Sequence, residues 1–306
     1  MTTSFLFPGQ GSQTVGMGAD ILKNSNAAKL VLEETDSTLD TSISKLIYEG
    51  PISELTRSEN AQPAILSISI AILYAAKEYQ NIPDPAFYAG HSVGEYSALV
   101  ASNSLSLADG LRLVRKRGQL MQLACEKQPS SMAALIGLDL ERSLEACKGT
   151  KAQVANVNSE QQIVIGGELA DLDIAIDNAK ALGARRAIKL EVAGAFHTEV
   201  MRPAQKPMEI ELQDVQISAP SAPVIANTTG KPISEPDQIR KELKQQLCGC
   251  VYWLQSMEYL NSMNVDTFIE FGPGGVLSGL AKRIAPASTI KTVSSINEIN
   301  TLVDLY

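Results

Sequence analysis

The sequence predicts an α/β fold in which a parallel sheet carries helices on both faces and a smaller βαββαβ unit is inserted. Short apolar runs alternate with helical patterns over residues 1–127, which is typical of such a sheet. Residues 128–195 change to the order β-α-β-β-α-β, and residues 196–306 return to α/β character. We therefore expect a large domain of residues 1–127 and 196–306 and a ferredoxin-like small subdomain of residues 128–195.

The first elements support the parallel sheet. Residues 4–7 form a short apolar run ended by Pro8-Gly9-Gln10-Gly11-Ser12, which indicates a buried strand entering a tight loop. Helical patterns follow over residues 27–46 and, after Gln62-Pro63, over residues 65–76. The second is apolar nearly all round, so we expect it to be buried. A strand at residues 86–89 and a helix at 95–101 come next.

The later elements continue the α/β alternation of the large domain and the β-α-β-β-α-β order of the insertion. A helix is predicted over 107–125, with Ser106 as its N-cap and Asp109 completing part of a capping box. The inserted unit comprises strands at 132–138, 152–158, 163–166 and 187–192 and helices at 140–148 and 169–182. Two further strands, at 223–226 and 267–271, return the chain to the large sheet.

Composition excludes several classes of protein. The net charge of -8 and the lack of a Lys/Arg-rich run argue against nucleic-acid binding. No apolar run is long enough for a membrane span, and the N-terminus lacks the pattern of a secretion signal, so we expect a cytoplasmic protein. Cys248-Gly249-Cys250 has no second Cys/His pair beside it, and we expect packed thiols and no metal site.

A Gly-x-Ser-x-Gly pentapeptide, Gly90 to Gly94, joins the strand at 86–89 to the helix at 95–101. A strained turn in this context exposes a nucleophilic serine, here Ser92. Serine needs a base, usually histidine, and the chain has only two histidines. His91 precedes the serine on a sharp turn and should point away from the hydroxyl, which leaves His197. The apolar residues before His197 are also compatible with a core imidazole that has no catalytic role.

Arg117 is a candidate anion-binding residue. On the predicted helix its neighbours three and four residues away are all apolar: Leu113, Val114, Leu120 and Met121. A guanidinium in an apolar sector needs an anionic partner, because burying an unpaired charge costs free energy. The partner is either an internal Asp or Glu or the carboxylate of a substrate, which arginine can bind with two parallel hydrogen bonds.

These segments together resemble the malonyl-CoA:acyl-carrier-protein transacylases over about residues 4–283. The shared motifs are Phe7-Pro8-Gly9-Gln10-Gly11-Ser12-Gln13, Gly90-His91-Ser92-Val93-Gly94-Glu95-Tyr96-Ser97, Arg117-Gly118 with Met121, Ala155-Asn156-Val157-Asn158-Ser159, Gly194-Ala195-Phe196-His197 and Glu270-Phe271-Gly272-Pro273-Gly274. The resemblance implies an α/β-hydrolase-like large domain and transfer of malonyl from malonyl-CoA to acyl carrier protein through a malonyl-Ser92 ester.

The resemblance also implies the role of each site residue. His197 deprotonates Ser92, and the main-chain carbonyl of Gln246 orients His197. The backbone N–H groups of Gln10 and Val93 form the oxyanion hole. Arg117 binds the malonyl carboxylate, and the other substrate-binding residues are Met121, Phe196, His91 and Asn156. Phe196 fills the space that an α-methyl group would need, so malonyl is the acyl group that we expect the protein to transfer.

Two departures from the family pattern lie outside the nucleophile, base and carboxylate clamp. Cys250 stands where relatives commonly carry proline, which makes the placing of the Gln246 carbonyl an open question, and Gly275 replaces a longer side chain. The resemblance further implies a monomer without a bound cofactor. Its substrates are malonyl-CoA and phosphopantetheinylated acyl carrier protein, and no nucleic acid or membrane partner is expected.

Three alternative functions differ in what they require. A stand-alone acyltransferase that loads polyketide synthase carrier domains would carry the same residues, so the sequence does not separate it from fatty acid synthesis. A serine acyl-thioester hydrolase would also use Ser92 and His197, but Arg117 weighs against a general esterase. An inactive binding protein would be expected to lack one of these three residues.

Overall fold

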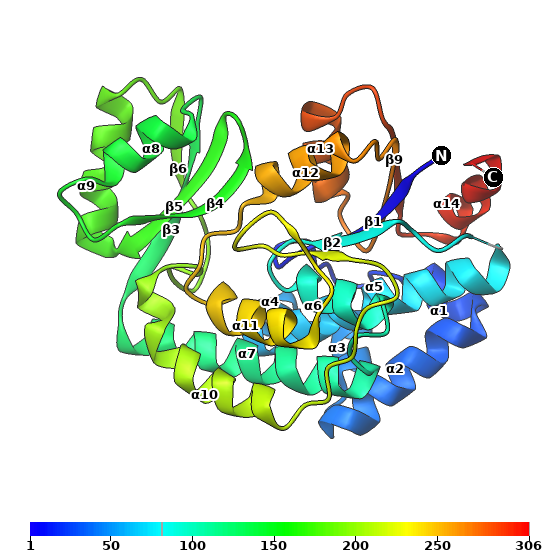
Figure 1. Cartoon of the computed structure of the whole chain (residues 1–306). Helices are drawn as coiled ribbons and strands as arrows, with labels where there is room; N and C mark the ends of the chain where they lie inside the picture. The colour runs from blue at the N-terminus through cyan, green and yellow to red at the C-terminus, as the bar shows by residue number, and fades with distance from the viewer. Residues whose placement is uncertain (81, 306) are drawn as a thin grey trace.

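Two separate sheets organise the chain in the computed structural model, which describes residues 1–80 and 82–305 (Figure 1). The large sheet has the strand order β10-β9-β1-β2-β7-β8, and every pairing is parallel except that of β7 with β8. This confirms the predicted α/β class. The strands are β1 Thr3–Phe7, β2 Phe87–Gly90, β7 Val224–Ile225, β8 Pro232–Ile233, β9 Thr267–Phe271 and β10 Thr289–Val293.

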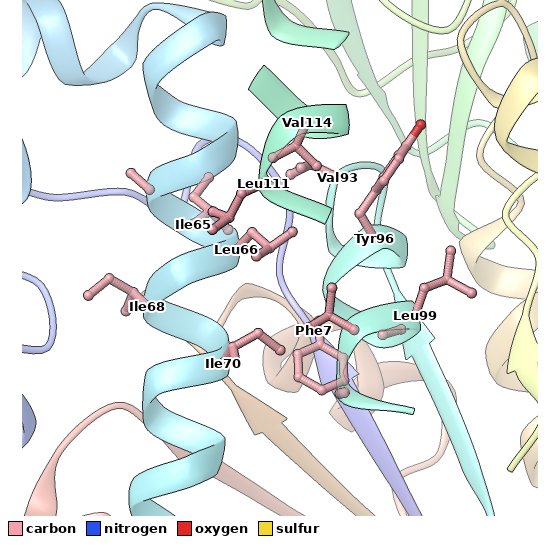
Figure 2. Packing of buried hydrophobic residues seen from close by; sticks show 14 of the residues in the cluster. Phe7, Ile65, Leu66, Ile68, Ile70, Val93, Tyr96, Leu99, Leu111 and Val114 are labelled. Carbon is pink, nitrogen blue, oxygen red and sulfur yellow. The ribbon is translucent and has the colours of Figure 1, made fainter. Parts of the chain in front are cut away.

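Helices cover both faces of this sheet because its buried strands present apolar side chains to each side. In β1, Phe5 and Phe7 pack on the face covered by α5 Ser58–Tyr79, α6 Gly94–Ala101 and α7 Leu107–Lys127, as Figure 2 shows for Phe7. Leu6 faces the opposite core, together with residues of α12 Trp253–Ser262 and α13 Val276–Ile284. The nucleophile motif between β2 and α6 is thus held by packing on both sides.

The predicted helix over residues 27–46 is wrong as a single element. The structure has α2 Asn26–Leu39 and α3 Ile43–Glu49, separated at Asp40, which takes a left-handed conformation with φ 47°. The Asp36 carboxylate accepts the Ser44 N–H at 2.9 Å, so it provides the start of α3 with a partner that a continuous helix would not need.

The helix predicted to start at residue 65 begins earlier, at Ser58, and includes Pro63. Proline in a helix removes the hydrogen bond to the carbonyl four residues before it, here that of Glu59. Arg115 Nη1 donates to the Glu59 carbonyl at 2.7 Å and replaces the lost partner. The start of α7 is as predicted, since the Ser106 hydroxyl accepts the Asp109 N–H at 3.0 Å.

The second sheet lies within the predicted insertion and is antiparallel, with the order β4-β5-β3-β6. One face packs against α8 Leu140–Cys147 and α9 Leu169–Ala181, whereas Met132, Ala134 and Val164 on the other face join the core of the large sheet. We propose that residues 128–195 form the small subdomain. Its strands are β3 Ser130–Ile136, β4 Gln153–Ser159, β5 Gln162–Glu168 and β6 Arg186–Lys189.

The strand predicted over residues 187–192 stops at Lys189, and residues 190–192 line a cavity instead. The remaining helices lie outside residues 128–195. They are α1 Ala19–Asn24, α4 Ile52–Thr56, α10 Arg202–Gln213, α11 Pro236–Gln246 and α14 Ile296–Asn300, with 3-10 turns at Glu199–Met201 and Thr301–Leu305. Across residues 1–80 and 82–305, no helix has both the length and the apolar character needed to cross a bilayer.

Candidate active site

Ser92 lies on a sharp turn between β2 and α6, with a left-handed backbone (φ 55°). A Cβ at Gly90 would lie 2.0 Å from the backbone of Gly94, and one at Gly94 would lie 2.1 Å from the Phe7 carbonyl oxygen. Both positions therefore exclude any side chain. A non-glycine residue held with positive φ is strained, and such strain is typical of a serine presented as a nucleophile.

His197 is hydrogen-bonded to Ser92, with Nε2 2.7 Å from the serine Oγ. Its Nδ1 lies 2.8 Å from the main-chain oxygen of Gln246, the last residue of α11. Carbonyls at the C-terminal end of a helix lack an intrahelical partner, so this oxygen is free to accept the Nδ1–H. The Nε2 of the neutral imidazole then faces the serine proton as an acceptor. Cys250, in place of proline, is compatible with this carbonyl geometry.

The surroundings of His197 lead us to expect an unusual pH dependence for the acylation of Ser92. Burial, together with the charge of nearby Arg117, lowers the pKa of His197 from 6.5 to about 3. A lowered pKa keeps the base neutral as the pH falls. We expect the rate of Ser92 acylation to change less than about twofold between about pH 7.5 and about pH 5.5, whereas a base of ordinary pKa would lose about tenfold.

Single-turnover acylation, quenched and followed by intact-mass spectrometry, measures this rate directly. A rate that falls with a midpoint near the ordinary histidine value would contradict the expectation.

Arg117 projects from α7 into the same site and is 1% exposed. Its Nη1 donates to Gln62 Oε1 at 2.8 Å, and its Nη2 lies 3.1 Å from Ser92 Oγ and 3.0 Å from Gln246 Oε1. The guanidinium carbon lies 5.7 Å from the ring centroid of Tyr96. Among the described residues, no Asp or Glu forms a salt bridge with it. Its hydrogen-bonding partners are neutral groups, and one of its nitrogens faces the serine hydroxyl.

A cavity of about 450 Å³ opens onto Ser92 and His197. Predicted site residues from five separate segments line it: Gln10, His91, Met121, Asn156 and Phe196. His91 Nε2 is paired with Asn158 Oδ1 at 2.9 Å, and burial lowers the pKa of His91, which favours a neutral ring. The buried Asn156 Oδ1 has no hydrogen-bond partner in the described part of the chain.

The two predicted oxyanion donors have different surroundings. Val93 immediately precedes α6, so its N–H belongs to a helix N-terminus, where backbone donors lack intrahelical partners. Gln10 lies in the loop after β1, and its side-chain Nε2 donates to Ser58 Oγ at 3.2 Å. That bond ties the loop to the start of α5.

Asn227 is a site residue that sequence reasoning missed. Its Oδ1 accepts the Ser92 N–H at 2.7 Å, and its Nδ2 donates to the Gly90 carbonyl at 2.7 Å. Asn227 thus holds both arms of the nucleophile turn. A signal was present, because a polar amide directly follows the strand predicted at residues 223–226, and residues at the carboxyl ends of neighbouring parallel strands meet at one edge of a sheet.

Gln62 was also missed. Its Oε1 accepts from Arg117, and its Nε2 contacts Met121 Sδ at 3.4 Å. Gln62 is fully buried at the start of a helix whose other residues are mostly apolar. A lone amide in such a segment indicates a polar partner inside the core.

A strained serine on a strand-to-helix turn, a histidine bonded to it and a buried guanidinium beside both form the kind of site that acyl-transfer enzymes use. The family model described as "Acyl transferase domain" matches residues 4–297. The malonyl CoA-acyl carrier protein transacylase of Bacillus subtilis is 44% identical, covering 92% of this chain and 90% of that protein. The Escherichia coli protein of the same name is 40% identical, covering 96% of each.

Solved structures agree with this similarity. An acyl-carrier-protein S-malonyltransferase from Bartonella henselae has a TM-score of 0.95 at 40% identity, covering 100% of this chain and 99% of its own. A malonyl-transacylase in complex with its type II polyketide synthase acyl-carrier protein has a TM-score of 0.96 at 34% identity, covering 100% of each. The chain belongs to the family of malonyl-CoA:acyl-carrier-protein transacylases.

Proposed function

We propose that this chain transfers the malonyl group from malonyl-CoA to the phosphopantetheine thiol of acyl carrier protein and so supplies fatty acid synthesis. The observation that carries the proposal is the position of Arg117. Its Nη2 lies 3.1 Å from the Ser92 hydroxyl, and its hydrogen-bonding partners are uncharged. A buried cation at this distance from the nucleophile favours an acyl group that carries its own carboxylate.

The first half-reaction forms the serine ester. His197 Nε2 takes the proton of Ser92 while the serine Oγ attacks the thioester carbonyl of malonyl-CoA. The N–H groups of Gln10 and Val93 stabilise the negative charge that develops on the carbonyl oxygen. The C–S bond then breaks, the proton passes from His197 to the sulfur, and coenzyme A leaves as a thiol.

The second half-reaction is the reverse with a different thiol. The phosphopantetheine sulfur of acyl carrier protein gives its proton to His197 and attacks the malonyl-Ser92 ester, and Ser92 regains the proton as it leaves. His91, Met121, Asn156 and Phe196 line the cavity beside the acyl group. In this proposal Phe196 occupies the space that an α-methyl group would need and so disfavours methylmalonyl.

The proposal extends to the setting of the reaction. We infer a cytoplasmic monomer that works without a bound cofactor, takes acyl carrier protein and malonyl-CoA as partners, and uses neither nucleic acid nor a membrane. Loading of a polyketide synthase carrier is the second candidate, because one similar structure pairs a malonyl-transacylase with a type II polyketide synthase carrier. Comparing transfer rates to the two kinds of carrier protein distinguishes these pathways.

The lifetime of the acyl-enzyme tests the proposal against hydrolysis. When the protein is mixed with malonyl-CoA and the released coenzyme A is removed, we expect malonyl-Ser92 to persist and to be seen by intact-mass spectrometry. A thiol acceptor should then discharge it at once. Rapid loss of the label to malonate without any thiol would assign the chain to the hydrolases.

A further inference from the structure

Glu95 is a buried acid that the mechanism above does not use. It lies in the first turn of α6, three residues after Ser92, and is 0% exposed. Burial, and next the nearby Glu242 carboxyl, raise the pKa of Glu95 well above its usual value. Burying a carboxyl group is costly unless it is hydrogen-bonded, so its partners need an explanation.

Those partners belong to the active site. Gln246 Nε2 donates to Glu95 Oε2, and the Asn227 N–H lies 3.4 Å from Glu95 Oε1. No Lys, Arg or His of the described residues forms a salt bridge with Glu95. The carboxyl group therefore contacts two residues that themselves hold the nucleophile turn and the base.

Gln246 also contacts Ser92, Arg117 and His197. Its Nε2 also donates to the Ser92 carbonyl at 3.0 Å, and its Oε1 accepts from Arg117 Nη2 at 3.0 Å. Its main-chain oxygen accepts from His197. Rotating the amide by half a turn would place two hydrogens against the guanidinium and an oxygen against two acceptors. Glu95 and the Ser92 carbonyl, as acceptors, thus favour the orientation in which Gln246 holds Arg117, and Glu95 is the acceptor that a side-chain substitution can remove.

We propose that Glu95 is a positioning residue: through the side-chain amide of Gln246 it holds the Arg117 guanidinium beside Ser92, and the amide keeps the carboxyl group of Glu95 out of direct contact with Arg117. A carboxylate in direct contact with Arg117 would satisfy the cation and compete with the substrate. An amide between them fixes the guanidinium in place and leaves its charge available to a malonyl carboxylate. This inference rests on the proposed function.

The test compares acylation of Ser92 by malonyl-CoA and by acetyl-CoA in the full-length protein. Glu95→Leu removes the acceptor, and we expect kcat/KM for malonyl-CoA to fall about tenfold or more while the acetyl value changes less than about threefold. Glu95→Gln keeps an oxygen for the Gln246 amide and should restore the malonyl value to within about threefold of wild type.

Glu242→Leu is the matched control. Glu242 is a second buried carboxyl close to Glu95, but it accepts hydrogen bonds from the backbone and the hydroxyl of Thr228. The Glu242→Leu substitution should lower the midpoint of thermal unfolding and leave the ratio of malonyl to acetyl rates unchanged. The inference would be overturned if Glu95→Leu lowered kcat/KM equally for malonyl-CoA and acetyl-CoA. It would also be overturned if the ratio of malonyl to acetyl rates were the same in the Glu95 and Glu242 variants.

Gln246→Glu keeps the test decisive if Glu95→Leu does not fold. It preserves the main-chain oxygen that holds His197 but sets a carboxylate directly against Arg117, so KM for malonyl-CoA should rise about tenfold or more and acetyl labelling should persist. An unchanged malonyl KM would refute the need for a neutral bridge. Wild-type preference for malonyl-CoA tests the proposed function separately, since it does not depend on Glu95.

Discussion

Replacing Ser92 with alanine should abolish transfer, with kcat falling about 10⁴-fold or more. The substitution removes the atom that would carry the malonyl group, and the hydroxyl that lies 2.7 Å from His197 Nε2. Intact-mass spectrometry after incubation with malonyl-CoA should show no added mass. Alanine keeps the shape of the turn, so the thermal unfolding midpoint should change by only a few degrees.

Ser97→Ala is the control for this experiment. Ser97 lies on the same helix, is fully buried, and its hydroxyl has no hydrogen-bond partner among the described residues. Its loss should leave the transfer rate within about twofold of wild type. Residual malonyl labelling in Ser92→Ala would show that another nucleophile carries the acyl group.

Replacing Arg117 with alanine should remove the preference for malonyl. We expect kcat/KM for malonyl-CoA to fall about 10²- to 10³-fold, because a charge-assisted hydrogen bond between substrate and protein is lost in the site. Acetyl-CoA, which has no carboxylate, should acylate Ser92 at close to its wild-type rate. Competition between the two thioesters for labelling of Ser92 measures the ratio in one experiment.

Arg112→Ala provides the comparison on the same helix. Arg112 is exposed and forms a surface salt bridge with Asp109 at 3.2 Å, so its loss should change neither rate. If Arg117→Ala kept its preference for malonyl, carboxylate recognition would have to be assigned to another cation, and the proposed function would lose its main support.

The sequence predicted the meeting of Ser92, His197 and Arg117 for identifiable reasons. The nucleophile motif has a strict spacing, and the chain offers only two histidines. Arg117 was noticeable because its helical neighbours are apolar. The structure brings these three side chains together, and it places the Gln246 carbonyl against the imidazole as the resemblance implied. Their catalytic roles remain predictions.

The residues that support these three could not be found in the same way. Gln62, Glu95 and Asn227 are single polar residues whose partners lie 55, 151 and 135 positions away in the chain. Their hydrogen bonds form only because particular helices and strands pack together, and hydrophobic periodicity does not predict which elements are neighbours. The break at Asp40 was missed for a related reason, since an apolar pattern that resumes in phase hides a change of chain direction.

The shared packing of the two sheets bears on how substrate reaches Ser92. Because Met132, Ala134 and Val164 of the small sheet belong to the core beneath the large one, swinging the two sheets apart would expose apolar surface to water. We therefore expect the two sheets to stay in contact and the cavity at Ser92 to keep its shape during turnover. The thioester arm of the substrate would then enter and leave this cavity without a movement of the sheets, so the turnover rate should depend on the mobility of the arm and of its carrier.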